Sequence, residues 1–259
     1  MPILLSGLER ALVIAVPIAA GALIWRLWRQ RLAGRYRYFT AYLLYILAAP
    51  CIVPFLDRDS YAYFVTFACI ETVGWVMQML VVFELFALLF RKYPGVGAAG
   101  RDFMKIAFAL AVLITILLAV LNHQSGPGKH PAVEAFFLVS RVVTSLILAF
   151  IALMIGFLMW FPLPLNRNTL SYLGGYSVYF LGLGITQFAG NMLGPDAYRW
   201  LSAVEFLIAF ACLVFWNLVL TRSGEESALT VSRHWDPADE SRLLRQLESI
   251  NASLVRARK

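Results

Sequence analysis

The stretch CIETVGWVMQMLVVFELF, from Cys69 to Phe86, is almost wholly apolar, yet it carries Glu71, Gln78 and Glu84. A membrane span needs about 20 mostly apolar residues, because the hydrocarbon core is ~30 Å thick and a helix rises ~1.5 Å per residue. With its apolar flanks, this stretch is long enough to span. An ionisable group in hydrocarbon costs ~2.5–3.5 kcal/mol on insertion scales, so its acids predict a specific role.

The whole chain shares this apolar character. Of its 259 residues, 61% are hydrophobic and only 14% are charged. A soluble domain is about half apolar and roughly a quarter charged, so lipid is the expected solvent. The Lys and Arg residues behind the net charge of +7 lie mainly in the connections between the apolar runs and in the tail. That placement favours orientation against anionic lipid and not the binding of nucleic acid.

Seven apolar runs predict an all-α membrane protein with seven transmembrane helices. The runs are 8–28, 36–56, 61–90, 103–122, 132–161, 169–193 and 198–220. Each must be helical, because lipid offers backbone groups no partners. Lys and Arg are richer in the odd-numbered connections and after the last run, which predicts an outside N-terminus and a cytoplasmic C-terminus. Short loops and an Ala-, Leu- and Arg-rich composition are typical of a bacterial inner (plasma) membrane.

The predicted seven-helix bundle covers residues 1–221, and the tail that follows it has a different sequence pattern. Residues 222–235 read as a linker, and 236–259 predict a cytoplasmic amphipathic, coiled-coil-like helix with Asp236 as N-cap and Pro237 in the first turn. Spacings of 4, 3 and 4 define an apolar seam, which consists of Leu243, Leu247, Ile250 and Leu254. The helix either lies on lipid or pairs through this seam with a protein partner or a second copy of the chain.

Counting residues from the middle of each predicted span places four polar residues, each from a different run, at one depth in the membrane. With the predicted topology, Glu71, Arg141, Gln187 and Glu205 each lie four to six residues to the outer side of their span's middle, roughly 6–9 Å above the mid-plane. Helical spacing extends this layer to Gln78, Thr144, Asn191 and Ser202. Glu84 and Asn217 belong to a second, inner level, where they cap helix ends or bond across helices.

Three interpretations of the outer layer remain open. It is a structural ion-pair network that fixes neighbouring helices, in which Arg141 is satisfied by Glu71 and Glu205. Alternatively, it is a binding cavity in which Arg141 grips a small anionic or polar ligand and the acids orient it. A proton or ion path is the third interpretation.

Recognisable catalytic and cofactor chemistry is missing from the sequence. It contains no Walker loop, dinucleotide fingerprint or nucleophile motif, and no predicted span holds a His. His123, His130 and Glu134 have no specific metal-ligand spacing, so we predict no metal, no cofactor and no catalytic residue. The leading hypothesis is a non-enzymatic sensor or receptor; an accessory subunit of a membrane complex comes second, and a small transporter or membrane enzyme third.

Overall fold

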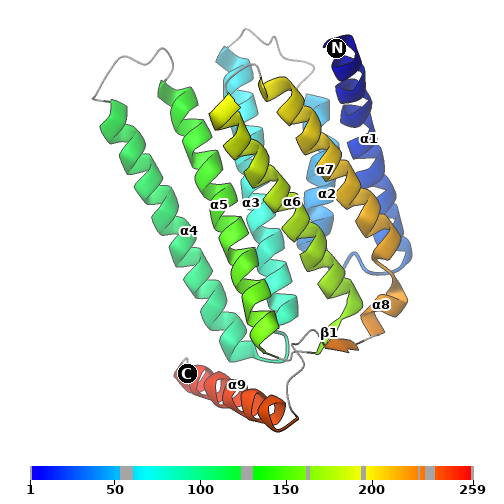
Figure 1. Ribbon diagram of the computed structural model, residues 1–259, viewed down its shortest axis with the longest axis vertical. Coiled ribbons are helices and arrows are strands. Elements are labelled where there is room, and N and C mark those ends of the chain that lie inside the picture. Colours follow the sequence, from blue (N-terminus) through cyan, green and yellow to red (C-terminus); the bar gives the residue numbers. More distant parts are fainter. Residues whose placement is uncertain are drawn as a thin grey trace. The chain divides into compact units, whose positions relative to one another are not determined.

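The structure is a computed structural model that describes residues 2–52, 61–123, 131–161, 164–193, 197–226, 228–230 and 237–257. Its long helices are α1 (Pro2–Arg29), α2 (Arg37–Ile52), α3 (Tyr61–Leu89), α4 (Pro94–His123), α5 (Pro131–Trp160), α6 (Arg167–Leu193) and α7 (Tyr198–Val219) (Figure 1). Each predicted apolar run overlaps one of them. The all-α class is confirmed, with one addition, a two-stranded sheet of β1 (Pro164–Asn166) and β2 (Ala228–Thr230).

Four helices among the described residues are long and apolar enough to cross a membrane. The stretches are Ala11–Arg29, Val65–Leu89, Leu138–Trp160 and Trp200–Val219. They support a membrane protein, but not the count of seven spans. The 16 residues of α2 reach only ~24 Å, and Arg101 and Lys105 lie in the first half of α4. In α6, glycines and polar residues alternate with the apolar residues, so the helix is less hydrophobic than the four candidate spans.

The chain divides into two compact units. Unit 1 comprises residues 1–81 and 171–224, and unit 2 comprises 82–170 and 225–259. In unit 1, α1 packs against α7 and α2. In unit 2, α4 packs against α5 and against α9 (Pro237–Ala257). The predicted bundle over 1–221 therefore contributes to both units.

The turn between α1 and α2 is fixed by a Schellman motif. Arg31 adopts a positive φ of 58°, its N–H donates to the Trp28 carbonyl, and the Leu32 N–H donates to the Leu27 carbonyl at 2.8 Å. This pattern satisfies carbonyls that a helix end leaves unpaired. Leu27 and Leu32 are both buried, which supplies the hydrophobic contact that accompanies the motif.

Unit 1 has an aromatic core. Phe39, Tyr172, Tyr176 and Trp216 are all buried, and Phe39 and Tyr176 lie against the Trp216 ring with centroid distances of 5.1 and 4.9 Å. The Trp216 ring also lies against Gly175, where any Cβ would overlap it. Asn217 bonds across helices, because its amide donates to the Ala19 carbonyl of α1 at 3.1 Å.

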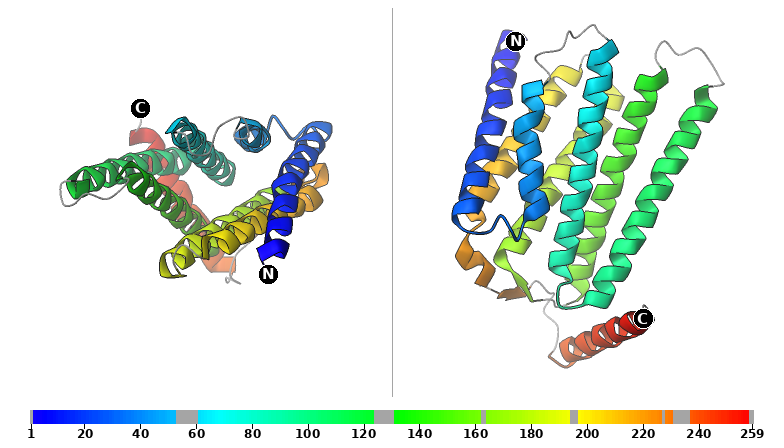
Figure 2. Two further views of the ribbon diagram at one scale, coloured as in Figure 1. Left: turned by 90° about the horizontal axis from the view of Figure 1, so that it is seen from above. Right: turned by 180° about the vertical axis from the view of Figure 1, so that it is seen from behind.

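In unit 2, α9 lies against the start of α4 (Figure 2). The Asn251 Oδ1 accepts hydrogen bonds from the N–H groups of Gly95, at 2.7 Å, and Val96, at 3.4 Å. These N–H groups belong to the first turn of α4, which has no intrahelical partners for them. Asn251 therefore caps a helix that is more than 150 residues earlier in the chain. Because Gly95 lacks a Cβ, α9 approaches this turn closely.

The segment that the sequence assigned to a linker, 222–235, contains α8 (Arg222–Glu226) and β2. Strand β2 pairs antiparallel with β1, with Leu165 opposite Leu229. Both carboxylate oxygens of Glu225 accept hydrogen bonds, one from the Asn166 amide at 3.0 Å and one from the Asn168 amide at 3.1 Å. These bonds tie the tail segment to the connection between α5 and α6.

Glu225→Ala should destabilise the protein by about 1–3 kcal/mol, because two amides lose a charged acceptor and Asn168 is fully buried. Glu226→Ala is the matched control, since Glu226 is the exposed neighbour and surface changes usually stay within ~0.5 kcal/mol. Unfolding of the purified protein in detergent by SDS titration measures both effects. Equal losses in the two variants would show that the bonds to Glu225 contribute little.

Candidate functional site

Glu205 of α7 and Thr186 of α6 form a short polar contact between two helices of unit 1. The Thr186 hydroxyl lies 2.6 Å from the Glu205 Oε1 and 2.9 Å from the Leu183 carbonyl oxygen. One hydroxyl proton cannot serve both acceptors fully. Thr186 donates to Glu205 or to Leu183 and so ties the carboxyl of α7 to the backbone of α6.

Glu71 of α3 lies close enough to Glu205 for the two carboxyls to interact electrostatically. Both side chains are half-buried. Lys and Arg are missing from residues 40–52, 65–81, 171–193 and 200–219, the stretches that carry this region in unit 1. The charged residues within these stretches are therefore acids. They favour the binding of a group that is positively charged or donates hydrogen bonds.

Three further polar side chains of unit 1 join these acids. The Gln78 amide donates to the Tyr42 hydroxyl at 3.4 Å, and the hydroxyls of Tyr42 and Tyr179 lie 3.5 Å apart. Tyr42 interacts electrostatically with Glu71, and Tyr179 with Glu205. The residues Tyr42, Glu71, Gln78, Tyr179, Thr186 and Glu205 together form what we call the unit 1 polar cluster.

The structure thus brings together three of the predicted layer residues, Glu71, Gln78 and Glu205. The polar layer predicted from the sequence does not include Thr186, Tyr42 or Tyr179. Gln187 and Ser202 are half-buried in unit 1, where Ser202 lies one turn before Glu205. Asn191 lies in α6, but its side chain is outside the described residues.

Arg141 and Thr144 belong to α5 and hence to unit 2. The Arg141 side chain is exposed within the structure, whereas Thr144 is buried. The pairing of Arg141 with Glu71 and Glu205 stays a prediction. Glu84, expected at the inner level, is a buried acid of unit 2.

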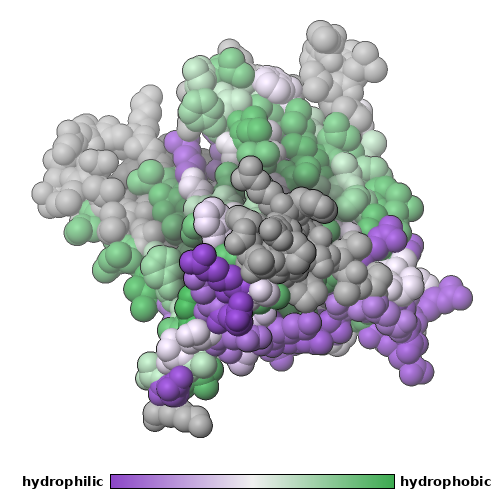
Figure 3. Space-filling model, turned by 60° about the horizontal axis from the view of Figure 1, so that its bottom comes forward, coloured by the Kyte–Doolittle hydropathy of each residue, from purple (hydrophilic) through white to green (hydrophobic). Residues whose placement is uncertain are grey.

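The apolar seam of α9 is used largely within the chain itself. Leu247 is 1% exposed, and Leu243 and Leu254 are half-buried. Ile250 is 48% exposed and lies outside the packed face. Three arginines, Arg242, Arg245 and Arg256, are exposed and lie 140° or more around the helix from Leu247. Hydrophilic side chains gather along the lower part of the face shown in Figure 3.

No group of three His, Cys, Asp or Glu side chains that could hold a metal occurs among the described residues. Of the three residues weighed as metal ligands, His130 lies outside the described residues, as do the side chains of His123 and Glu134. No protein-family model, curated protein or solved structure matches the chain. The function therefore has to be inferred from the polar cluster and from α9.

Proposed function

We propose that the chain is a non-enzymatic sensor or receptor of a bacterial inner membrane. In this proposal it crosses the membrane seven times, with its N-terminus outside. The observation that carries the proposal is the interaction of the acids Glu71 and Glu205, in stretches 65–81 and 200–219 that carry no Lys or Arg, together with the hydrogen bond of Thr186 to Glu205. Two carboxyls in a medium of low dielectric constant repel each other unless a proton or a positively charged group joins them.

The ligand that suits these acids is small and carries an ammonium group or several hydrogen-bond donors. Tyr42 and Tyr179 support this class, because a tyrosine ring attracts a cation to its face and its hydroxyl accepts a hydrogen bond. The unit 1 polar cluster contains two acids and no Lys or Arg. We therefore propose a cationic ligand in place of the small anionic or polar ligand that the sequence predicts.

The output of the sensor is proposed to be α9. Its apolar residues pack within unit 2 through Leu247, while Arg242, Arg245 and Arg256 remain exposed on the opposite side. An arginine face suits an acidic surface on a cytoplasmic protein partner. A second candidate function, an accessory subunit of a larger membrane complex, is favoured by this same face, since docking alone would explain it.

Thermal unfolding of the detergent-purified protein tests the ligand class. Methylamine, choline and spermidine are the cationic probes, and benzoate and phosphate are the anionic ones. We expect a cationic probe to raise the Tm by several degrees, because a ligand that binds only the folded state stabilises it. Glu71→Gln and Glu205→Gln should each abolish that rise.

Ser202→Ala is the matched control, since Ser202 lies one turn from Glu205 on α7 and outside the unit 1 polar cluster. It should retain the rise in Tm. Stabilisation by anions, or by cations equally in both Gln variants, would overturn the proposed ligand class. Replacement of Arg242, Arg245 and Arg256 by Glu separates the two functions. An accessory subunit would lose its complex, and no ligand would take part. A sensor would still bind the cation.

A further inference from the structure

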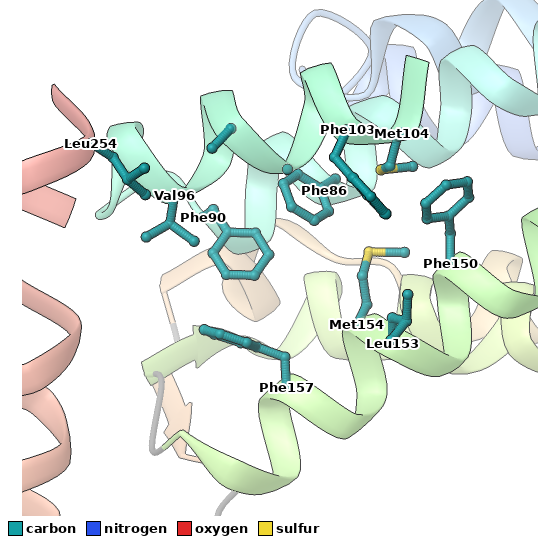
Figure 4. Close-up of a pocket in the computed structure, with 12 residues that line it drawn as sticks. Phe86, Phe90, Val96, Phe103, Met104, Phe150, Leu153, Met154, Phe157 and Leu254 are labelled. Atoms are coloured by element: carbon teal, nitrogen blue, oxygen red, sulfur yellow. The ribbon is translucent and has the colours of Figure 1, made fainter. Parts of the chain in front are cut away.

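Unit 2 contains an apolar pocket of about 310 Å3 between α3, α4 and α5, with one side chain of α9 at its end. Met154 and Phe157 of α5 face Phe86 and Phe90 of α3 across it (Figure 4). Its complete lining is Phe86, Phe90, Val96, Ala99, Gly100, Phe103, Met104, Phe150, Leu153, Met154, Phe157 and Leu254. None of these side chains has an N–H, an O–H or an oxygen acceptor, and the two thioether sulfurs are weak acceptors, so water would find few partners there.

The pocket lies at one end of two candidate spans, Val65–Leu89 and Leu138–Trp160. Leu153 belongs to the candidate span Leu138–Trp160, seven residues before its end, which corresponds to ~10 Å along the helix. Phe86 belongs to the candidate span Val65–Leu89. In a membrane, the part of the pocket at Phe86 and Leu153 borders lipid chains, whereas Phe90 follows the end of its span.

The pocket also has exposed apolar side chains at its edge. Phe103 of α4 is 62% exposed and Leu153 of α5 is 63% exposed, although both line the pocket. Leu153 belongs to a candidate span, so in a membrane its surface faces lipid, whereas Phe103 follows Arg101 and Asp102 near the start of α4. The two exposed side chains form an apolar edge between α4 and α5.

We propose that this pocket binds one hydrocarbon chain of a membrane lipid and that Leu254 of α9 closes one end of it. A volume of about 310 Å3 lies at the low end of ligand sites, ~300–1,000 Å3, and so suits a single chain. The flexible side chains of Met104 and Met154 adapt to a chain of irregular shape. The site is separate from the unit 1 polar cluster and does not depend on the proposed function.

Photo-crosslinking tests this site. The full-length protein is placed in nanodiscs that contain phosphatidylcholine with a diazirine at the end of one acyl chain, and the labelled residues are mapped by mass spectrometry. We expect labelling of residues 96–104 and 150–157 to exceed that of Leu110, Leu113 and Leu117 by at least fivefold. These three leucines are exposed on α4 outside the pocket and report ordinary contact with lipid.

Val96→Trp fills the pocket from a half-buried lining position and should reduce its labelling at least fivefold. Ala99→Trp is a second filling variant, should the first fail to fold. Ala109→Trp is the matched control, because Ala109 is exposed on the other side of α4 and does not line the pocket. Labelling of the pocket no stronger than that of the three leucines, or unchanged in a folded filling variant, would overturn the proposal.

Discussion

Leu247→Asp should release α9 from unit 2. Leu247 is 1% exposed, so the change removes a buried apolar side chain, which usually costs 2–5 kcal/mol, and adds a charge that has to be desolvated. Asn251 would then leave the first turn of α4. Because the N–H groups of Gly95 and Val96 would lose their acceptor, their hydrogen exchange should become roughly 100-fold faster, as expected for a loss of ~3 kcal/mol.

Ile250→Asp is the matched control for this experiment. It makes the same chemical change three residues away, at a side chain that is 48% exposed. Exchange at Gly95 and Val96 should stay near the wild-type rate, since surface changes usually stay within ~0.5 kcal/mol. If Ile250→Asp accelerated exchange as much as Leu247→Asp, the packed face of α9 would not be the one described.

Gly175→Leu should prevent unit 1 from packing, with an expected loss of about 3 kcal/mol or more. A Cβ at Gly175 would overlap the Trp216 Nε1 and lie 2.6 Å from its Cε2. The ring has little freedom to move, because Phe39 and Tyr176 pack against it. Overpacking usually costs 1–3 kcal/mol of stability. Because the aromatic neighbour here cannot move away, we expect a cost at the upper end of this range or above it.

The adjacent glycine provides the control. Gly174 is exposed and has no atom within 4 Å of an added Cβ. Gly174→Leu should therefore be neutral or stabilise by up to ~1 kcal/mol, since Leu forms helices better than Gly. SDS titration of both variants in detergent measures the difference. Destabilisation by Gly174→Leu as large as that by Gly175→Leu would mean that helix propensity, and not the contact with Trp216, decides the outcome.

The sequence predicts the long helices well, because each rests on an apolar run of about 20 residues. Depth arithmetic places Glu71 and Glu205 at one level, which stays a prediction, and in the structure the two carboxyls interact electrostatically. It cannot choose the face of a helix. Gln187 and Thr186 lie at nearly the same depth, but one residue turns the helix by ~100°, and it is Thr186 that contacts Glu205.

Other features depend on contacts that leave no local pattern. The strands β1 and β2 have three residues each, too few to show a period of two, and the partners of Glu225 lie 57 and 59 positions away. The apolar seam of α9 was predicted by its spacing. Its orientation was not, because Asn251 bonds to the start of α4, and Ile250 is left exposed.

The packing of α1 against α7 sets an order of events during synthesis. Asn217 and Ala19 are 198 positions apart, so at 5–20 residues per second the ribosome needs roughly 10–40 s to make the partner of α1. Throughout that interval, the face of α1 that packs against α7 lacks this partner. By contrast, α4 and α5 are consecutive and can pair as soon as both leave the ribosome. Unit 1 is therefore the part of the chain that stays longest open to wrong helix pairings.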